Sequence, residues 1–360
     1  MTFFGRIITP IQLSLFLLSI GAGTTITFSS SSWLLAWIGL EINTISIIPL
    51  IIWSSAPRAS EATTKYFLIQ ACAATLVLFA AILNLVFVSE WGLHIPLHNA
   101  TTTILIIALS LKLGLAPFHF WIPEVLQGLD LPTGIILSTL QKFAPFVIIH
   151  EIMETANFIN SIYILLFSIA IISIFVGGLG GLNQVHIRKL LAYSSIAHLG
   201  WIILVITLNH GCALIAIAIY VITTCAIFIL IIWIQAKTVK SAAAGWTKTP
   251  IIAFLLALVL FSLAGLPPFL GFAPKWFILN QSVTHNIIIL VIAAIVANLI
   301  TLFFYIRLLY HVLITLPPAA ILSSIFTRFN PKKTSIYLPG LISFIVFGIT
   351  LVALIISCSG

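Results

Sequence analysis

Charge is what this sequence has least of. Only 6% of its 360 residues are charged, whereas 61% are hydrophobic. A soluble domain carries about 25% charged residues, so lipid must be the solvent around most of this chain. Apolar segments continue from end to end and leave no room for a separate aqueous domain of ordinary size. We therefore expect a single integral membrane domain over residues 1–360.

Several other signatures are missing. The cysteines show no close pairing, which argues against disulfides and an iron–sulfur cluster. The net charge of +8 is spread along the chain, without the basic face that nucleic-acid binding needs. The glycine-rich segment 177–181 follows an apolar helix rather than a strand, so it does not fit a dinucleotide-binding loop. The N-terminus resembles neither a presequence nor a cleaved leader. We predict no bound metal, no cofactor in this chain and no nucleic-acid partner.

Apolar segments of about 20 residues, the length that spans a bilayer, recur between turn and charge signals. They predict an all-α membrane bundle of about eleven transmembrane helices. The expected ranges are 7–27, 32–52, 62–88, 100–128, 132–150, 158–180, 189–208, 211–236, 249–283, 285–312 and 335–357.

Basic residues support this topology. Lysine and arginine gather on the side from which a membrane protein inserts, and twelve of the fifteen fall on the face that holds the predicted N-terminus. These are Arg6, Arg58, Lys65, Arg188, Lys189, Lys237, Lys240, Lys248, Arg307, Arg328, Lys332 and Lys333. An odd number of helices places the C-terminus on the opposite side.

Two spans, 100–128 and 249–283, are long and interrupted by proline and glycine, so we expect both to be discontinuous. They also resemble each other: Gly265, in Gly-Leu-Pro-Pro-Phe, lies 151 positions after Gly114, in Gly-Leu-Ala-Pro-Phe. A second match places Leu190 156 positions after Leu34. Five helices separate equivalent segments, which predicts an inverted five-helix repeat. The first copy covers 7–150 and the second 158–312, followed by a C-terminal helix at 335–357.

Four charged residues lie deep in these spans, where topology does not require them: Glu41, Lys112, Lys142 and Lys275. A charge at such depth costs about 2.5–3.5 kcal/mol on insertion scales. Structural ion pairs or snorkelling side chains are the alternative reading, but one acid does not pair three bases. Burial moves the pKa of a lysine from about 10.4 toward neutrality, where the amine exchanges protons. We therefore predict proton transfer, with Glu41 modulating Lys112 and Lys142 passing a proton toward Lys275.

His198 is a further candidate, because an imidazole between two lysines suits a proton relay. A hydrogen-bonded packing histidine is nearly as good an interpretation. The proton-relay candidates are thus Glu41, Lys112, Lys142, Lys275 and His198.

Four motifs in order resemble the antiporter-like membrane subunits of respiratory complex I over nearly the whole chain. They are 111–124, which includes Leu-Lys-Leu-Gly-Leu-Ala-Pro-Phe-His-Phe-Trp, Gln-Lys-Phe-Ala-Pro at 141–145, and the segments 191–201 and 265–276. The resemblance implies that the residue matching Glu41 pairs with the lysine matching Lys112. It also implies that the lysines matching Lys142 and Lys275 lie on a central hydrophilic axis, with His198 near it.

The same resemblance implies a subunit of the proton-translocating NADH:ubiquinone reductase, in the mitochondrial inner membrane, with the N-terminus in the matrix and the C-terminus in the intermembrane space. Other subunits would then handle NADH, FMN, iron–sulfur clusters and ubiquinone. The expected partners are neighbouring antiporter-like and small hydrophobic membrane-arm subunits and the lipid bilayer. The wider family has fourteen helices, and we expect this chain to lack the first three. A cation/proton antiporter subunit and a structural spacer remain the alternatives.

Overall fold

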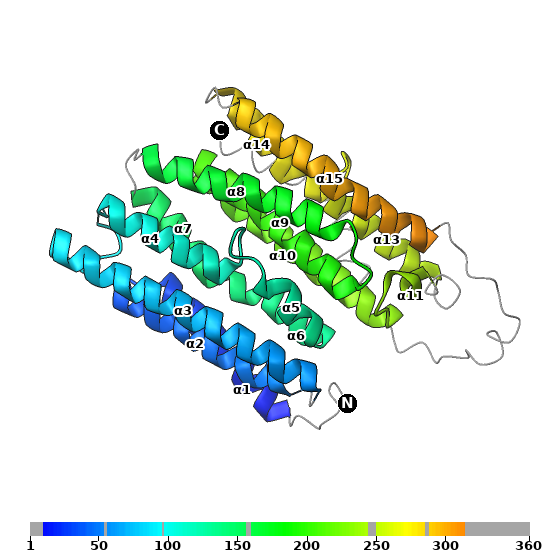
Figure 1. The fold of residues 1–360 in the computed structure, drawn as a ribbon, viewed down its shortest axis with the longest axis horizontal. Helices are drawn as coiled ribbons and strands as arrows, with labels where there is room; N and C mark the ends of the chain where they lie inside the picture. Colours follow the sequence, from blue (N-terminus) through cyan, green and yellow to red (C-terminus); the bar gives the residue numbers. More distant parts are fainter. Residues whose placement is uncertain are drawn as a thin grey trace, which may run out of the picture.

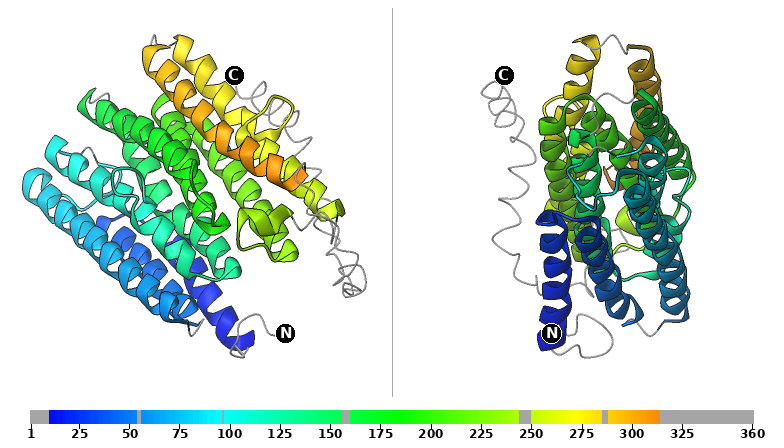
Figure 2. Two further views of the ribbon diagram at one scale, coloured as in Figure 1. Left: turned by 45° about the vertical axis from the view of Figure 1, so that its right-hand side comes forward. Right: turned by 90° about the vertical axis from the view of Figure 1, so that its left-hand side faces the viewer.

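The computed structural model describes residues 10–53, 56–95, 97–155, 160–243, 250–284 and 288–313. Within them, the chain forms long helices that share one general direction and advance from α1–α3 at one edge to α13–α15 at the other (Figure 1). Figure 2 shows the same helices side by side in two further views. Helices are the natural choice in lipid, because they satisfy every backbone donor and acceptor within one segment.

The first half contains α1 (Pro10–Phe28), α2 (Trp33–Ile52), α3 (Pro57–Val88), α4 (Asn99–Leu113), α5 (Trp121–Gly128), α6 (Leu131–Ser138) and α7 (Leu140–Thr155). The second contains α8 (Asn160–Gly181), α9 (Ile187–Leu208), α10 (His210–Ile234), α11 (Val239–Ala243), α13 (Pro250–Ala264), η1 (Leu270–Phe272), α14 (Ala273–Thr284) and α15 (Ile288–Leu313). Eight spans in the described ranges are long and apolar enough to cross a membrane. The predicted span 335–357 lies outside those ranges.

Both predicted discontinuities are confirmed. α4 ends at Gly114 with a left-handed φ of 74°, and α5 resumes at Trp121. α13 ends before Gly265, whose φ is 75°, and α14 resumes after η1. Glycine populates positive φ without steric cost, so each glycine turns the chain out of its first half-helix at the middle of the bundle.

The span predicted at 132–150 is present as Leu131–Thr155, but it is interrupted, which the sequence did not predict. α6 ends at Ser138 and α7 begins at Leu140, with Thr139 at φ −116° and ψ −73°. Neither glycine nor proline occupies the interruption, and Pro145 lies inside α7. The hydroxyls of Ser138 and Thr139 instead donate to the Ile135 carbonyl at 3.1 and 2.6 Å, a pattern that bends helices.

Apart from the buried Lys112, Lys142 and Lys275, the lysines and arginines of the described chain lie at one end of the bundle. Arg188 donates to the carbonyls of Gln127 and Leu129 at the end of α5, and Arg307 donates to the Leu182 carbonyl at 2.5 Å. Lys65 forms ion pairs with Glu61 and Glu124 at 2.5 and 2.6 Å, on the same face. The one-sided distribution of charge predicted from the sequence therefore holds for these residues, several of which tie loops to helix ends.

Among the described residues, the buried apolar core consists of two large clusters stacked along the helices and a small third cluster of Ile219, Leu270, Ala273 and Phe277. One large cluster fills the end that carries the basic residues and contains α5, the start of α9, the end of α10 and α13. The other fills the opposite end and contains α4, most of α7, the end of α9 and the start of α10. The broken helices are interrupted where the two large clusters meet. Polar side chains at that level lie between the two large apolar clusters.

Candidate functional site

The level between the two apolar clusters holds the three lysines that the sequence singled out. Lys112 ends α4, Lys142 follows the interruption between α6 and α7, and Lys275 begins α14. Each side chain is only 5–7% exposed. Lysine is almost never buried unless it is paired, so the way in which each ammonium is satisfied decides what the site does.

Lys112 has no hydrogen-bond partner at its Nζ atom in the structure. The break after α4 fixes its position, because Gly114 caps the helix and the indole of Trp121 donates to the Leu111 carbonyl at 3.2 Å. The amide of Gln70, on α3, lies 3.5 Å from the Lys112 carbonyl. The backbone around the amine is therefore held firmly while the amine itself is left unpaired.

Glu41 lies on α2 within electrostatic range of Lys112. The two do not form an ion pair within 4.0 Å, and the Glu41 carboxylate instead accepts a 2.8 Å hydrogen bond from the Thr44 hydroxyl. A carboxylate and an amine that are near but not in contact still interact through a medium of low dielectric. The structure thus brings the predicted pair together without closing the contact.

The Lys142 ammonium finds its hydrogen-bond partner in Tyr220, a residue that the sequence did not indicate. The Lys142 ammonium donates to the Tyr220 hydroxyl at 3.0 Å and lies 5.2 Å from the centre of its ring. The hydroxyl in turn donates to the Ser138 carbonyl at 2.9 Å. Tyr220 lies on α10, 78 positions along the chain, and no periodicity in the sequence indicates that the two side chains meet.

Lys275 reaches back across the second break. Its Nζ donates to the carbonyl of Ala264, the last residue of α13, at 2.9 Å, and lies 5.8 Å from the centre of the Trp201 ring. Lysine at the C-terminus of a helix is favourable, because the unpaired carbonyls there carry partial negative charge. The break between the half-helices thus supplies the partner that a continuous helix would not offer.

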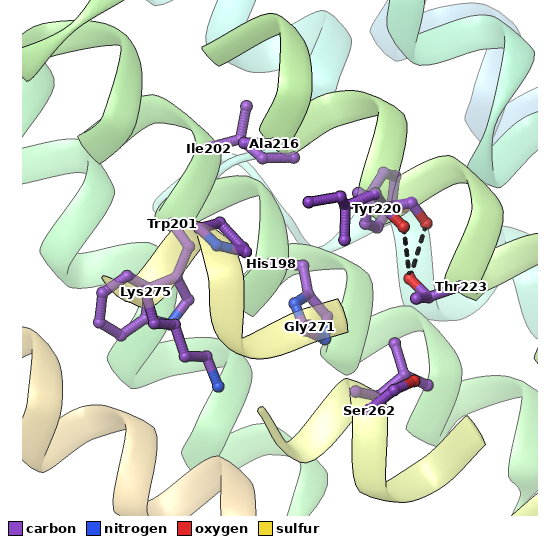
Figure 3. A pocket seen from close by; sticks show the side chains of 12 residues that line it. His198, Trp201, Ile202, Ala216, Tyr220, Thr223, Ser262, Gly271 and Lys275 are labelled. Atoms are coloured by element: carbon purple, nitrogen blue, oxygen red, sulfur yellow. Dashed lines mark hydrogen bonds between the residues drawn. The ribbon is translucent and has the colours of Figure 1, made fainter. Parts of the chain in front are cut away.

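His198 lies between these lysines. Its Nε2 atom is 3.1 Å from the Tyr305 hydroxyl of α15, and both Lys142 and Lys275 lie within its electrostatic range. His198, Tyr220 and Lys275 line a cavity (Figure 3). The space open to the centres of water molecules is about 20 Å³, and about 10–15 Å³ suffices for one water. A bridging water therefore fits between the tyrosine and the second lysine.

A second set of polar contacts joins the Lys112 side of the layer to the Lys142 side. Gln141, next to Lys142, donates to the Asn43 carbonyl of α2 at 2.7 Å, and the Tyr66 hydroxyl lies 3.5 Å from its Oε1 atom. Glu41 acts electrostatically on Tyr66. Gln141 belongs to the motif at 141–145, but neither it nor Tyr66 was among the predicted proton-relay residues. The polar layer therefore runs from α2 to α14 across the bundle.

The sequence matches known families along almost all its length. The profile described as NADH:quinone oxidoreductase/Mrp antiporter, TM, matches residues 30–301, and the NADH dehydrogenase subunit 2 C-terminus profile matches 302–356. The NADH-ubiquinone oxidoreductase chain 2 of Salmo salar is 48% identical over 89% of this chain and 90% of its own.

Solved structures share the fold. A chain of respiratory complex I from Thermus thermophilus with bound aureothin superposes with a TM-score of 0.81, at 24% identity over 95% of this chain and 78% of that one. A chain of the Mrp complex from Dietzia sp. DQ12-45-1b gives a TM-score of 0.75, at 18% identity over 82% of this chain and 60% of that one. The extensive match to curated relatives identifies the chain itself. It belongs to the NADH-ubiquinone oxidoreductase chain 2 family, the subunit 2 branch of the NADH:quinone oxidoreductase/Mrp antiporter membrane proteins.

Proposed function

We propose that this chain moves protons in the membrane arm of respiratory complex I, through the buried layer that contains Glu41, Lys112, Lys142, His198 and Lys275. The observation that carries the proposal is the position of three buried lysines at the one level where the apolar core divides. Lysines that served only to pack or to insert would gain nothing from being aligned there. Complex I supplies the free energy through NADH oxidation and ubiquinone reduction in its other subunits.

Glu41 and Lys112 form the loading end of the layer in this proposal. At about 4 Å and an effective dielectric near 20, a carboxylate and an ammonium attract each other by about 4 kcal/mol. Moving one charge against 100 mV requires about 2.3 kcal/mol. Closing or opening the contact between Glu41 and Lys112 therefore changes the charge on Lys112 with enough free energy to work against a membrane potential.

Lys142, His198 and Lys275 form the delivery end. Lys142 contacts Tyr220, and Tyr220 and Lys275 both line the cavity, so water in the cavity would continue the path from the tyrosine toward Lys275. His198 contributes an imidazole whose Nε2 atom lies 3.1 Å from the Tyr305 hydroxyl, a group able to exchange hydrogen bonds along the path. Protons leave toward the intermembrane space, with the basic face of the bundle in the matrix as the charge rule requires. The N-terminus then lies in the matrix and the C-terminus in the intermembrane space.

The expected surroundings follow from this placement. The chain is a multi-pass protein of the mitochondrial inner membrane, and its partners are neighbouring antiporter-like and small hydrophobic subunits. NADH, FMN, iron–sulfur clusters and ubiquinone belong to other subunits. In the described ranges, no group of three or more His, Cys, Asp or Glu side chains is arranged to hold a metal ion.

A subunit of a cation/proton antiporter is the second candidate, because the fold of an Mrp complex chain is similar. The two functions separate experimentally. Co-purification with redox subunits supports the complex I function, whereas sodium-dependent exchange without NADH oxidation supports the antiporter.

The decisive variant is Lys142→Met in the assembled complex, reconstituted into vesicles. We expect fewer protons translocated per NADH oxidised, because methionine keeps the length of the side chain but carries no proton. Lys240→Met is the matched control, since Lys240 is exposed on α11. Undiminished proton output in Lys142→Met, with Lys240→Met equally active, would refute the proposed function.

A further inference from the structure

The interruption between α6 and α7 redirects one backbone hydrogen bond. In a continuous α-helix the Lys142 N–H would donate to the carbonyl of Ser138, four residues earlier. Here it donates to Thr139 at 3.1 Å instead. The Ser138 carbonyl is thereby released at the centre of the membrane, where an unpaired carbonyl is costly.

Tyr220 takes the place of the missing backbone donor. Its hydroxyl donates to the released carbonyl at 2.9 Å, while its oxygen accepts from the Lys142 ammonium at 3.0 Å. Lys142 therefore takes part twice. Its backbone N–H is the donor that the Ser138 carbonyl has lost, and its side-chain ammonium donates to the hydroxyl that replaces that donor. The Ser138 carbonyl has two lone pairs; its donor here is the Tyr220 hydroxyl, and the Lys142 N–H of a regular helix would be a second donor that frees the hydroxyl from this task.

The orientation of the Tyr220 hydroxyl decides where a proton from Lys142 goes. With its hydrogen on Ser138, the hydroxyl offers Lys142 only a lone pair and offers the cavity no proton. When the Lys142 N–H reclaims Ser138, that hydrogen is free to turn toward the cavity, which Tyr220 lines together with His198 and Lys275. The same backbone change therefore opens the outlet for the proton.

We propose that Tyr220 is the proton relay between Lys142 and the cavity, and that exchange of the Ser138 carbonyl between Tyr220 and the Lys142 backbone opens and closes it. In the open state the tyrosine oxygen accepts a proton from the Lys142 ammonium as its own hydrogen passes to a water in the cavity. Lys142 becomes a neutral amine, Tyr220 stays a neutral phenol, and one proton has moved. The inference rests on the proposed function and adds to it the step that links the two lysines.

A purely structural tyrosine is the competing explanation, since buried hydroxyls usually find a partner. Such a tyrosine would need the Ser138 carbonyl alone. Here the Tyr220 hydroxyl also accepts a hydrogen bond from the Lys142 ammonium. The backbone N–H of the same lysine is the donor that the Ser138 carbonyl has lost. A structural role does not require this coincidence.

The test compares three variants of the assembled complex in vesicles: Tyr220→Phe, Lys142→Met and Tyr163→Phe. Tyr163, partly buried on α8 beside the core, provides a matched loss of one hydroxyl. We expect proton transfer at this step to slow about 10²-fold or more in Tyr220→Phe, the usual contribution of a positioned proton-transfer group. Its protons per NADH should fall to the level of Lys142→Met, and Tyr163→Phe should pump normally.

The outcomes distinguish the inference from the proposed function. Normal pumping in Tyr220→Phe beside deficient pumping in Lys142→Met overturns the relay and leaves the proposed function in place. Normal pumping in Lys142→Met overturns both. A structure of Tyr220→Phe should further show the Lys142 N–H bonded to Ser138 at about 3 Å, and a persisting bond to Thr139 would contradict the exchange.

If Tyr220→Phe does not assemble, infrared difference spectra of the unaltered complex decide. Tyrosine labelled with ¹³C at the ring carbon that bears the hydroxyl should show a C–O band that changes between resting and turning-over enzyme. The Ser138 carbonyl, labelled with ¹³C-serine, should change with it. An unchanged pair of bands during turnover overturns the inference.

Discussion

Adding one methyl group at Gly265 should distort the break between α13 and α14 and so impair proton translocation. Gly265 has a φ of 75°, which an L side chain adopts at a cost of about 1–2 kcal/mol. A Cβ atom at this position would collide with the Nζ atom of Lys275 and lie 2.8 Å from its Cε atom. Gly265→Ala therefore combines backbone strain with displacement of the buried amine.

The displacement has a calculable cost. Lys275 would leave the Ala264 carbonyl, to which it donates at 2.9 Å, and a hydrogen bond that involves a charged group contributes about 1.5–3 kcal/mol. Together with the strain, the variant loses about 2.5–5 kcal/mol of stability at this break, a factor of roughly 10²–10³·⁵ in the folding equilibrium at about 1.4 kcal/mol per factor of ten. The collision with the added Cβ moves Lys275 out of its native position.

The assay measures protons translocated per NADH oxidised in vesicles, together with the thermal stability of the complex. Gly21→Ala is the control, because a Cβ on this residue of α1 would meet nothing within 4 Å. Alanine is also a better helix former than glycine, so the control should assemble and pump normally. Equal pumping and equal stability in Gly265→Ala and Gly21→Ala would refute the importance of this turn.

Three further substitutions probe the rest of the structure. Arg188→Ala should lower the free energy of unfolding by about 1.5–3 kcal/mol, because the carbonyls at the end of α5 lose a charged donor. The melting temperature of the complex should fall accordingly, and an unchanged value would contradict this. Lys65→Ala should leave assembly unchanged in quantitative gels, since exposed ion pairs such as those with Glu61 and Glu124 contribute little, and poor assembly would show otherwise. Glu41→Gln keeps the hydrogen-bonding shape but removes the charge, so pumping should fall while NADH oxidation with an artificial acceptor continues; a normal proton yield would exclude Glu41 from loading.

The sequence was informative wherever a local chemical signal existed. Pro117 predicted the first interruption and Pro267, Pro268 and Gly271 the second. The structure places left-handed turns just before them, at Gly114 and Gly265. The three buried lysines, Lys112, Lys142 and Lys275, stood out because each is a charged residue inside a hydrophobic segment. The inverted repeat stays a prediction, supported by these equivalent turns.

The features that the sequence did not predict are tertiary. The break at Thr139 has no glycine or proline, and a hydroxyl from Tyr220 stabilises it from 82 positions away along the chain. A tyrosine in an apolar helix reads as ordinary packing until its partner is known. The gap between Glu41 and Lys112 is likewise invisible in sequence, since it depends on how far apart α2 and α4 lie.

The arginines at the basic face have a consequence for lipids. Arg188 and Arg307 already donate to backbone carbonyls at helix ends. An anionic headgroup that approaches this face must therefore compete with those carbonyls for the guanidinium groups. Among the described residues, the face offers a phospholipid fewer uncommitted cations than its composition suggests, and exposed lysines such as Lys237 and Lys240 remain available to it.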